Sequence, residues 1–398
     1  MNPLSPNIYK VEQATRLPSP GSRDGRPTSE ISLIPAPFSR GGFTILELLV
    51  SMIVLVLLVM VVAQLTDATA RSVKTSGQHM DAESQMRVVF DRMANDFAKM
   101  VRRKDADCLF YKKATAGTVA GNDAMFFYSE APAYYDFTST TPLTKSNVAL
   151  IGYRINTGNT AYPNTPVLER LGMGLTWDGA VSGTANGAPV FLTTPTGSAT
   201  PDPASTLVGN WGGNATSTLG TLSGGYSDGV DVGSYHVLGD LVYRMEIQFL
   251  LTDGTLSLIP VTNPSATTNN LSAGAPPTVS NGTPTYAPGS RWFDTAAGRG
   301  YICTSAVSGA ATWNPIGVQD VSAIVVTLAV LDSNSRKIIP STSVLSGAPL
   351  ADAASGIPVA KTWMDAVNGS TFAADSGIPQ AAAKQVRIYQ RTFSLNNP

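Results

Sequence analysis

One carboxylate lies inside the longest apolar run of the chain. Glu47 comes five residues after Gly42, and the apolar run continues almost unbroken to Leu65. A charged side chain in hydrocarbon costs at least about 2.5–3.5 kcal/mol, so it usually has a role and a partner. The natural partner is an amine, and a cut after Gly42 would create one, the α-amino group of Phe43. Because the ordinary pKa of that amine is about 7.7–8.0, it is mostly charged near neutral pH, and two opposite charges tolerate a low-dielectric site better as a pair than alone.

The apolar run predicts a helix that can cross a membrane. Residues 43–65 would form a helix of roughly 34 Å, and a hydrocarbon core is about 30 Å thick. Glu47 would lie near the first turn, where the helix dipole favours an anion. The polar members of the run are Thr44, Glu47, Ser51 and Gln64.

Residues 66–104 predict that this helix continues with a single apolar face. The stretch contains no proline, and Gly77 is its only helix breaker. Apolar residues recur every three or four positions at Met86, Val89/Phe90, Met93, Phe97 and Met100/Val101. The pairs Arg87–Asp91 and Arg92–Asp96 have the i,i+4 spacing of ion pairs and are expected on the solvated side. The apolar face requires a sheet to cover it.

Residues 105–398 predict an antiparallel β domain, which makes the fold class α+β: a long N-terminal helix packed on an antiparallel β-sheet. No helical pattern separates the expected strands, so hairpins and loops should connect them. The expected strands are Ala124–Tyr128, Val148–Ile155, Thr165–Leu171, Leu241–Leu251, Thr255–Ile259, Val321–Leu331 and Val386–Leu395.

Long low-complexity segments separate these strands and read as surface loops or insertions, at about 178–230, 261–317 and 340–379. Within the second segment, residues 289–316 contain aromatic runs separated by turn residues. Two interpretations remain open for that part: a small independent hairpin unit similar to those of phage tail fibres, or an aromatic loop that packs on the main sheet.

Composition argues against several functions. The net charge is −1 and 14% of residues are charged, so no global field would attract nucleic acid. The two histidines, His79 and His236, have no nucleophile beside them in a recognisable signature, and there is no phosphate-binding G-x-x-x-x-G-K-[ST] loop. No enzymatic activity, catalytic residue or cofactor is therefore expected.

Three smaller features have open interpretations. Asp228 and Asp231 could offer oxygen ligands to Ca²⁺, or could belong to a solvated acidic loop. Cys108 and Cys303 could form one bridge or remain two buried thiols. The basic run at residues 102–104 is expected to complement the dipole at the end of the helix.

The residues around Gly42 resemble the processing site of the type IV pilin and pseudopilin superfamily. The family pattern is a Gly, a cut, a Phe, three mostly apolar residues, a Glu and a hydrophobic helix, and Gly42, Phe43, residues 44–46 and Glu47 match it. The resemblance implies that a prepilin peptidase cuts between Gly42 and Phe43 and N-methylates Phe43. It also implies that Glu47 forms an assembly salt bridge with the Phe43 amine of a neighbouring subunit. Residues 1–42 would be a disordered leader, longer than is usual in the family.

The strand region is similar to the J-type minor pseudopilins of type II secretion systems. The supporting residues are Gly152-Tyr153-Arg154, Leu168-Glu169-Arg170, Leu241–Phe249 and Val321–Leu331, and the ending Arg387–Phe393 resembles the Verru_Chthon cassette protein C family. The resemblance implies a non-enzymatic structural subunit of a type II secretion or type IV pilus-like assembly. Its partners would be the prepilin peptidase, other pseudopilins through the N-terminal helix, and inner-membrane lipid, with no nucleic acid and no small-molecule substrate.

The basic residue Arg40, just before the apolar run, indicates a single pass through the inner membrane with a cytoplasmic N-terminus and a periplasmic C-terminal domain. Two alternatives remain. Residues 68–70 (Ala-Thr-Ala) could be a signal peptidase site, although the apolar run exceeds the usual length of about 7–15 residues. A signal-anchored surface adhesin or binding protein would use the loops and would need neither Glu47 nor the cut.

Overall fold

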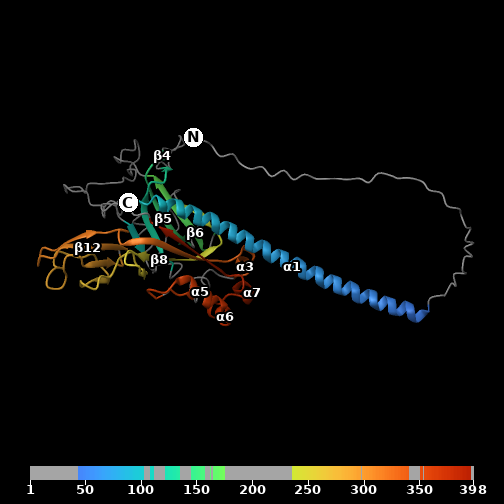
Figure 1. The fold of residues 1–398 in the computed structure, drawn as a ribbon. Coiled ribbons are helices and arrows are strands. Elements are labelled where there is room, and N and C mark those ends of the chain that lie inside the picture. The colour runs from blue at the N-terminus through green and yellow to red at the C-terminus, as the bar shows by residue number, and fades with distance from the viewer. Residues whose placement is uncertain are drawn as a thin grey trace, which may run out of the picture. The chain divides into compact units, whose positions relative to one another are not determined.

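The structure is a computed structural model, shown in Figure 1. It describes residues 44–102, 108–111, 122–134, 145–156, 162, 165–174, 235–296, 298–339, 350–352 and 354–395. The chain divides into two compact units, residues 1–67 and residues 68–398, and each is described by itself below.

The N-terminal helix α1 runs from Ile45 to Ala98. Its end comes earlier than the expected residue 104, because Lys99 is in a turn and Met100 forms an isolated antiparallel bridge with Ser129. Gly77 does not interrupt the helix. The chain thus combines a long, apolar-starting helix with antiparallel sheets, which is the expected α+β class.

Two sheets form the main β structure of the second unit. The five-stranded sheet has the order β1-β2-β5-β6-β7, and the four-stranded sheet has the order β15-β14-β8-β9; all of their pairings are antiparallel. Their strands are β1 (Cys108–Tyr111), β2 (Ala124–Ser129), β5 (Ala149–Asn156), β6 (Val167–Gly174), β7 (Tyr235–Gly239), β8 (Val242–Leu251), β9 (Leu256–Ser257), β14 (Val321–Val330) and β15 (Arg387–Ser394). A small hairpin pairs β3 (Ala133–Tyr134) with β4 (Lys145–Ser146).

Side chains from Asn122 and Asp123 connect the two sheets just before β2. The backbone N–H groups of Met245 and Ile247 donate to Asn122 Oδ1 and Asp123 Oδ2, each at 2.7 Å. These N–H groups lie on the edge of β8 that β9 leaves unpaired, since β9 pairs only with the end of that strand. The two side chains therefore satisfy buried backbone donors that would otherwise be costly.

A third sheet corrects the expectation of loops at residues 261–317. It has the order β10-β11-β12-β13 and consists of β10 (Asn270–Ala273), β11 (Arg291–Asp294), β12 (Arg299–Ser305) and β13 (Thr312–Pro315). The expectation of purely antiparallel pairing is wrong here, because β10 and β11 are parallel. The long connection between them makes this possible, since parallel neighbours need a crossover. Phe293 and Ile316 belong to the main core, so this segment packs on the main sheets.

Residues 340–379 are also not simply a surface loop. The described part forms helices α5 (Val359–Asn368) and α6 (Phe372–Ser376), with α7 (Gln380–Ala383) just after them; Figure 1 shows the three beside one another. Their buried side chains, such as Trp363 and Phe372, pack with Ala329 of β14. Since Leu328 and Val330 belong to the other cluster, these helices cover the opposite face of the four-stranded sheet. A further short helix, α3 (Ser333–Lys337), is N-capped by Asp332.

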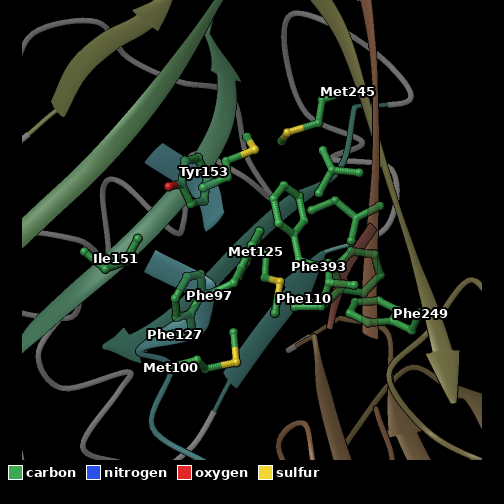
Figure 2. Close-up of a cluster of buried hydrophobic side chains, with 14 of the residues drawn as sticks. Phe97, Met100, Phe110, Met125, Phe127, Ile151, Tyr153, Met245, Phe249 and Phe393 are labelled. Atoms are coloured by element: carbon green, nitrogen blue, oxygen red, sulfur yellow. The ribbon is translucent and has the colours of Figure 1, made fainter. Parts of the chain in front are cut away.

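The main core lies where α1 meets both main sheets (Figure 2). Phe97 of α1 is central: its ring lies 5.2 Å from Phe127, 5.9 Å from Tyr153 and 5.1 Å from Phe393. The expected apolar face of the helix is confirmed, because its members are buried: Met86, Val89, Phe90, Met93, Phe97 and Met100. Aromatic contacts of this kind contribute about 0.5–1.5 kcal/mol each beyond the burial of their area.

Candidate assembly interface

The start of α1 is fixed by Thr44. The backbone N–H of Glu47 donates to Thr44 Oγ1 at 3.3 Å, and the N–H of Leu48 donates to the Thr44 carbonyl at 3.1 Å. Thr44 is therefore the N-cap, and the sequence Thr-x-x-Glu has the form of a capping box. The sequence analysis did not use this signal. Its consequence is that the helix begins two residues after Phe43.

Glu47 is exposed and lies in the first turn of α1. Gly42 and Phe43, the residues of the predicted cut, lie outside the described residues, as do the calcium candidates Asp228 and Asp231. The structure thus places the carboxylate at the start of the helix and leaves its predicted amine partner untested.

The large hydrophobic side chains from Ile45 to Leu65 are between 50 and 87% exposed. Within the part of the chain that the structure describes, α1 is the one helix long and apolar enough to cross a membrane. The polar groups in and just after this run are satisfied within the helix, since Ser51 Oγ donates to the Glu47 carbonyl and Thr66 Oγ1 donates to the Val62 carbonyl at 2.8 Å. Such a surface is compatible with lipid or with other apolar helices.

Asp96 attaches the second part of α1 to the five-stranded sheet. Its side chain is 1% exposed, and it accepts two bonds from Arg170 of β6, from Nε at 2.5 Å and from Nη2 at 2.9 Å. The Tyr153 hydroxyl of β5 donates to the same carboxylate. Burial and the neighbouring Asp96 charge raise the pKa of Tyr153 well above its ordinary value. Burial alone would lower the pKa of Arg170, but the bonds to Asp96 raise it overall, so both groups hold their protons.

This cluster corrects the expectation for the polar side of the helix. Asp96 is buried, not solvated, and Arg92 reaches it only at 3.8 Å. Arg87 pairs with Glu83, not with Asp91, at 3.5 Å. Asp91 instead accepts from Arg391 of β15 at 2.7 Å.

The two triplets that resembled J-type pseudopilins face each other in the sheet. Tyr153 is opposite Arg170, and Arg154 is opposite Glu169. The first pair turns toward Asp96, whereas the second forms a buried ion pair at 2.8 Å on the other face. Sequence analysis singled out these residues but not their interactions, because the partners are far apart along the chain.

The remaining candidates have structural settings. Cys108 and Cys303 are free, buried thiols, so the alternative of two separate thiols holds. His79 Nε2 lies 3.2 Å from Arg387 of β15. Arg102, at the end of α1, donates to the carbonyls of Val321 and Leu395. Among the described residues, no group of three His, Cys, Asp or Glu side chains could hold a metal ion.

Comparison with known proteins does not assign the chain to a family. No protein-family model matches it, and no curated protein sequence matches it significantly.

Proposed function

We propose that this chain is a minor pseudopilin-like, non-enzymatic subunit of a type II secretion or type IV pilus-like assembly. A prepilin peptidase cuts it between Gly42 and Phe43 and methylates Phe43. The apolar start of α1 inserts into the inner membrane in a single pass, with the preceding residues cytoplasmic and residues 68–398 on the other side.

The observation that carries the proposal is the organisation of α1. A capped helix start lies directly after the Gly42–Phe43 bond, Glu47 lies in its first turn, and the following apolar side chains are exposed. Residues later in the same helix, such as Met93 and Phe97, are buried against antiparallel sheets. A helix that is apolar all round needs a non-aqueous environment, whereas its amphipathic continuation belongs to a folded domain.

In this mechanism Glu47 selects the position of one subunit beside the next. A carboxylate near the membrane face of a lone subunit has a high desolvation cost. The Phe43 amine of an adjacent subunit neutralises that charge only when the two helices have the correct axial shift. Binding energy at one point of the helix is thereby converted into a defined stagger.

Replacing Glu47 tests this role. Glu47→Val should still insert, still be cut and still fold residues 68–398, but it should lose recovery of its partner subunits on co-purification. Glu47→Gln should be nearly as defective, because it keeps the shape and removes the charge.

Ser51→Ala is the matched control, since Ser51 lies one turn later and its hydroxyl bonds only within the helix. Its partner recovery should equal that of the wild type. Wild-type recovery by Glu47→Val would contradict the proposal and favour a signal-anchored adhesin, which has no use for this carboxylate.

A further inference from the structure

A second apolar surface lies on the later part of α1, within residues 68–398. Val73, Met80 and Val88 are 67, 68 and 61% exposed. Single exposed apolar residues are ordinary on a protein surface, so their alignment decides whether these three form a binding surface.

The three residues fall on one stripe of the helix. With Gly77 and Ser84 between them, they repeat at intervals of four, three, four and four residues, which is the spacing of a seam between packed helices. We call these five residues the outer seam. At about 100° per residue, it lies on the side of α1 opposite the buried Met86 and Met93. The helix therefore has one apolar face in the core and a second one that is unpartnered within the chain.

Large and small residues alternate along the outer seam. A Cβ added at Gly77 would meet nothing within 4 Å, so the backbone is open to close approach there. If a second copy lies parallel and is shifted by about one turn, or about 5.4 Å, Met80 of one copy faces the small residue Gly77 or Ser84 of the other. This arrangement lets large side chains enter the gaps that small residues leave, as in closely packed helix pairs. The seam is thus complementary to itself.

The charges beside the outer seam also fit a second copy. Lys74, Asp81, Glu83 and Arg87 flank it and sum to zero, and Glu83 already pairs with Arg87 at 3.5 Å. An anionic membrane surface or a nucleic acid would call for an excess of basic residues. A neutral border of both signs is compatible instead with another copy of the same border.

We infer that the outer seam docks a second copy of this chain, packed parallel and shifted by about one helical turn. The inference rests on the proposed function, because insertion of residues 45–65 of both copies in one membrane makes the two helices parallel. It goes further by assigning the partner and the contacting face of the exported part of α1.

Cysteine cross-linking of the full chain in its native membrane tests the inference. Two differently tagged copies are co-expressed, one carrying Met80→Cys and the other Ser84→Cys, and are oxidised before extraction. A disulfide forms only where the two Cα atoms come within about 7 Å. The expected result is a product of twice the monomer mass that contains both tags.

Ser72→Cys is the matched control, because Ser72 is also exposed on α1 but lies away from the outer seam. It should remain monomeric, and so should the wild type, whose cysteines are buried. The inference is overturned if the mixed product does not exceed the Ser72→Cys background, if Met80→Cys pairs mainly with itself, or if the product contains only one tag. The mature N-terminus is read from the same membranes, so a chain that starts at Phe43 without cross-linking contradicts this inference alone.

Discussion

Asp96 holds α1 on the five-stranded sheet through a buried carboxylate with three well-placed donor bonds. Removing one partner of a buried ion pair leaves the other charge without compensation. We therefore expect Asp96→Ala to lower the free energy of unfolding by about 3–5 kcal/mol, because Arg170 would stay buried and unpaired. Denaturant unfolding of the purified full chain, followed by tryptophan fluorescence, measures this.

Asp91→Ala is the control for that measurement. Asp91 and Arg391 form an exposed ion pair on the same helix, with side chains 60 and 41% exposed. Such pairs contribute about 0–1 kcal/mol. Equal losses in the two variants would show that the buried cluster does not hold the helix.

Asp320 predicts a dependence of stability on pH. Burial alone would raise its pKa, but bonds from Arg291 and Thr262 lower it below the ordinary value. A carboxyl with a lowered pKa in the folded state adds stability above its unfolded pKa of about 3.9 and loses it as pH falls through the folded value. Asp320→Asn should therefore cost about 1–3 kcal/mol at pH 7.

The difference between wild type and Asp320→Asn should shrink as pH falls below about 4, because the wild-type carboxyl then also becomes neutral. Thermal unfolding of both proteins across this range is the measurement. A difference that stays constant down to about pH 2 would mean that the charge of Asp320 does not stabilise the fold.

At the level of elements, α5 is a structural layer of the domain. Trp363 is fully buried, donates from Nε1 to the Ala351 carbonyl at 2.8 Å, and lies under the Arg244 guanidinium at 5.3 Å. Trp363→Ala should lower the free energy of unfolding by about 3–5 kcal/mol, since it opens a large cavity.

Met364 is the adjacent control for α5, because its side chain is 46% exposed. Met364→Ala should change the free energy of unfolding by about 0.5 kcal/mol or less. A small effect of Trp363→Ala would restore the view of residues 340–379 as a surface loop.

Local signals predicted α1 well, and non-local contacts explain most of what was missed. The apolar run and its periodicity lie within the helix itself, so its existence and its buried face could be read directly. The burial of Asp96 could not, because Arg170 follows it by 74 residues. Helix α5 was hidden by its Gly- and Ala-rich surroundings, although Val359 and Trp363 already have the i,i+4 spacing of a buried stripe.

Sheet pairing shows the same limit. The runs around β8 and β14 were recognisable as strands from their composition. The parallel pairing of β10 with β11 depends on how a long connection folds back, which no local pattern specifies. The Thr44 cap, by contrast, was a readable signal that the sequence analysis overlooked.

For the whole molecule, a membrane anchor and a folded domain share one helix, and the cut after Gly42 would give that helix its charged N-terminus. The Thr44 cap places the helix start just beyond that bond. Residues 68–70, the competing signal peptidase site, lie inside continuous helix. A cut there would separate the apolar run from the domain, whereas a cut after Gly42 keeps them together.

The N-terminal residue of the mature protein tests this account most directly. Sequencing of the chain extracted from its native membrane should find Phe43 with one added methyl group, and Gly42→Ala should leave most of the protein uncut. A mature start near Arg71, or wild-type protein in which residues 1–42 are retained, would contradict the account.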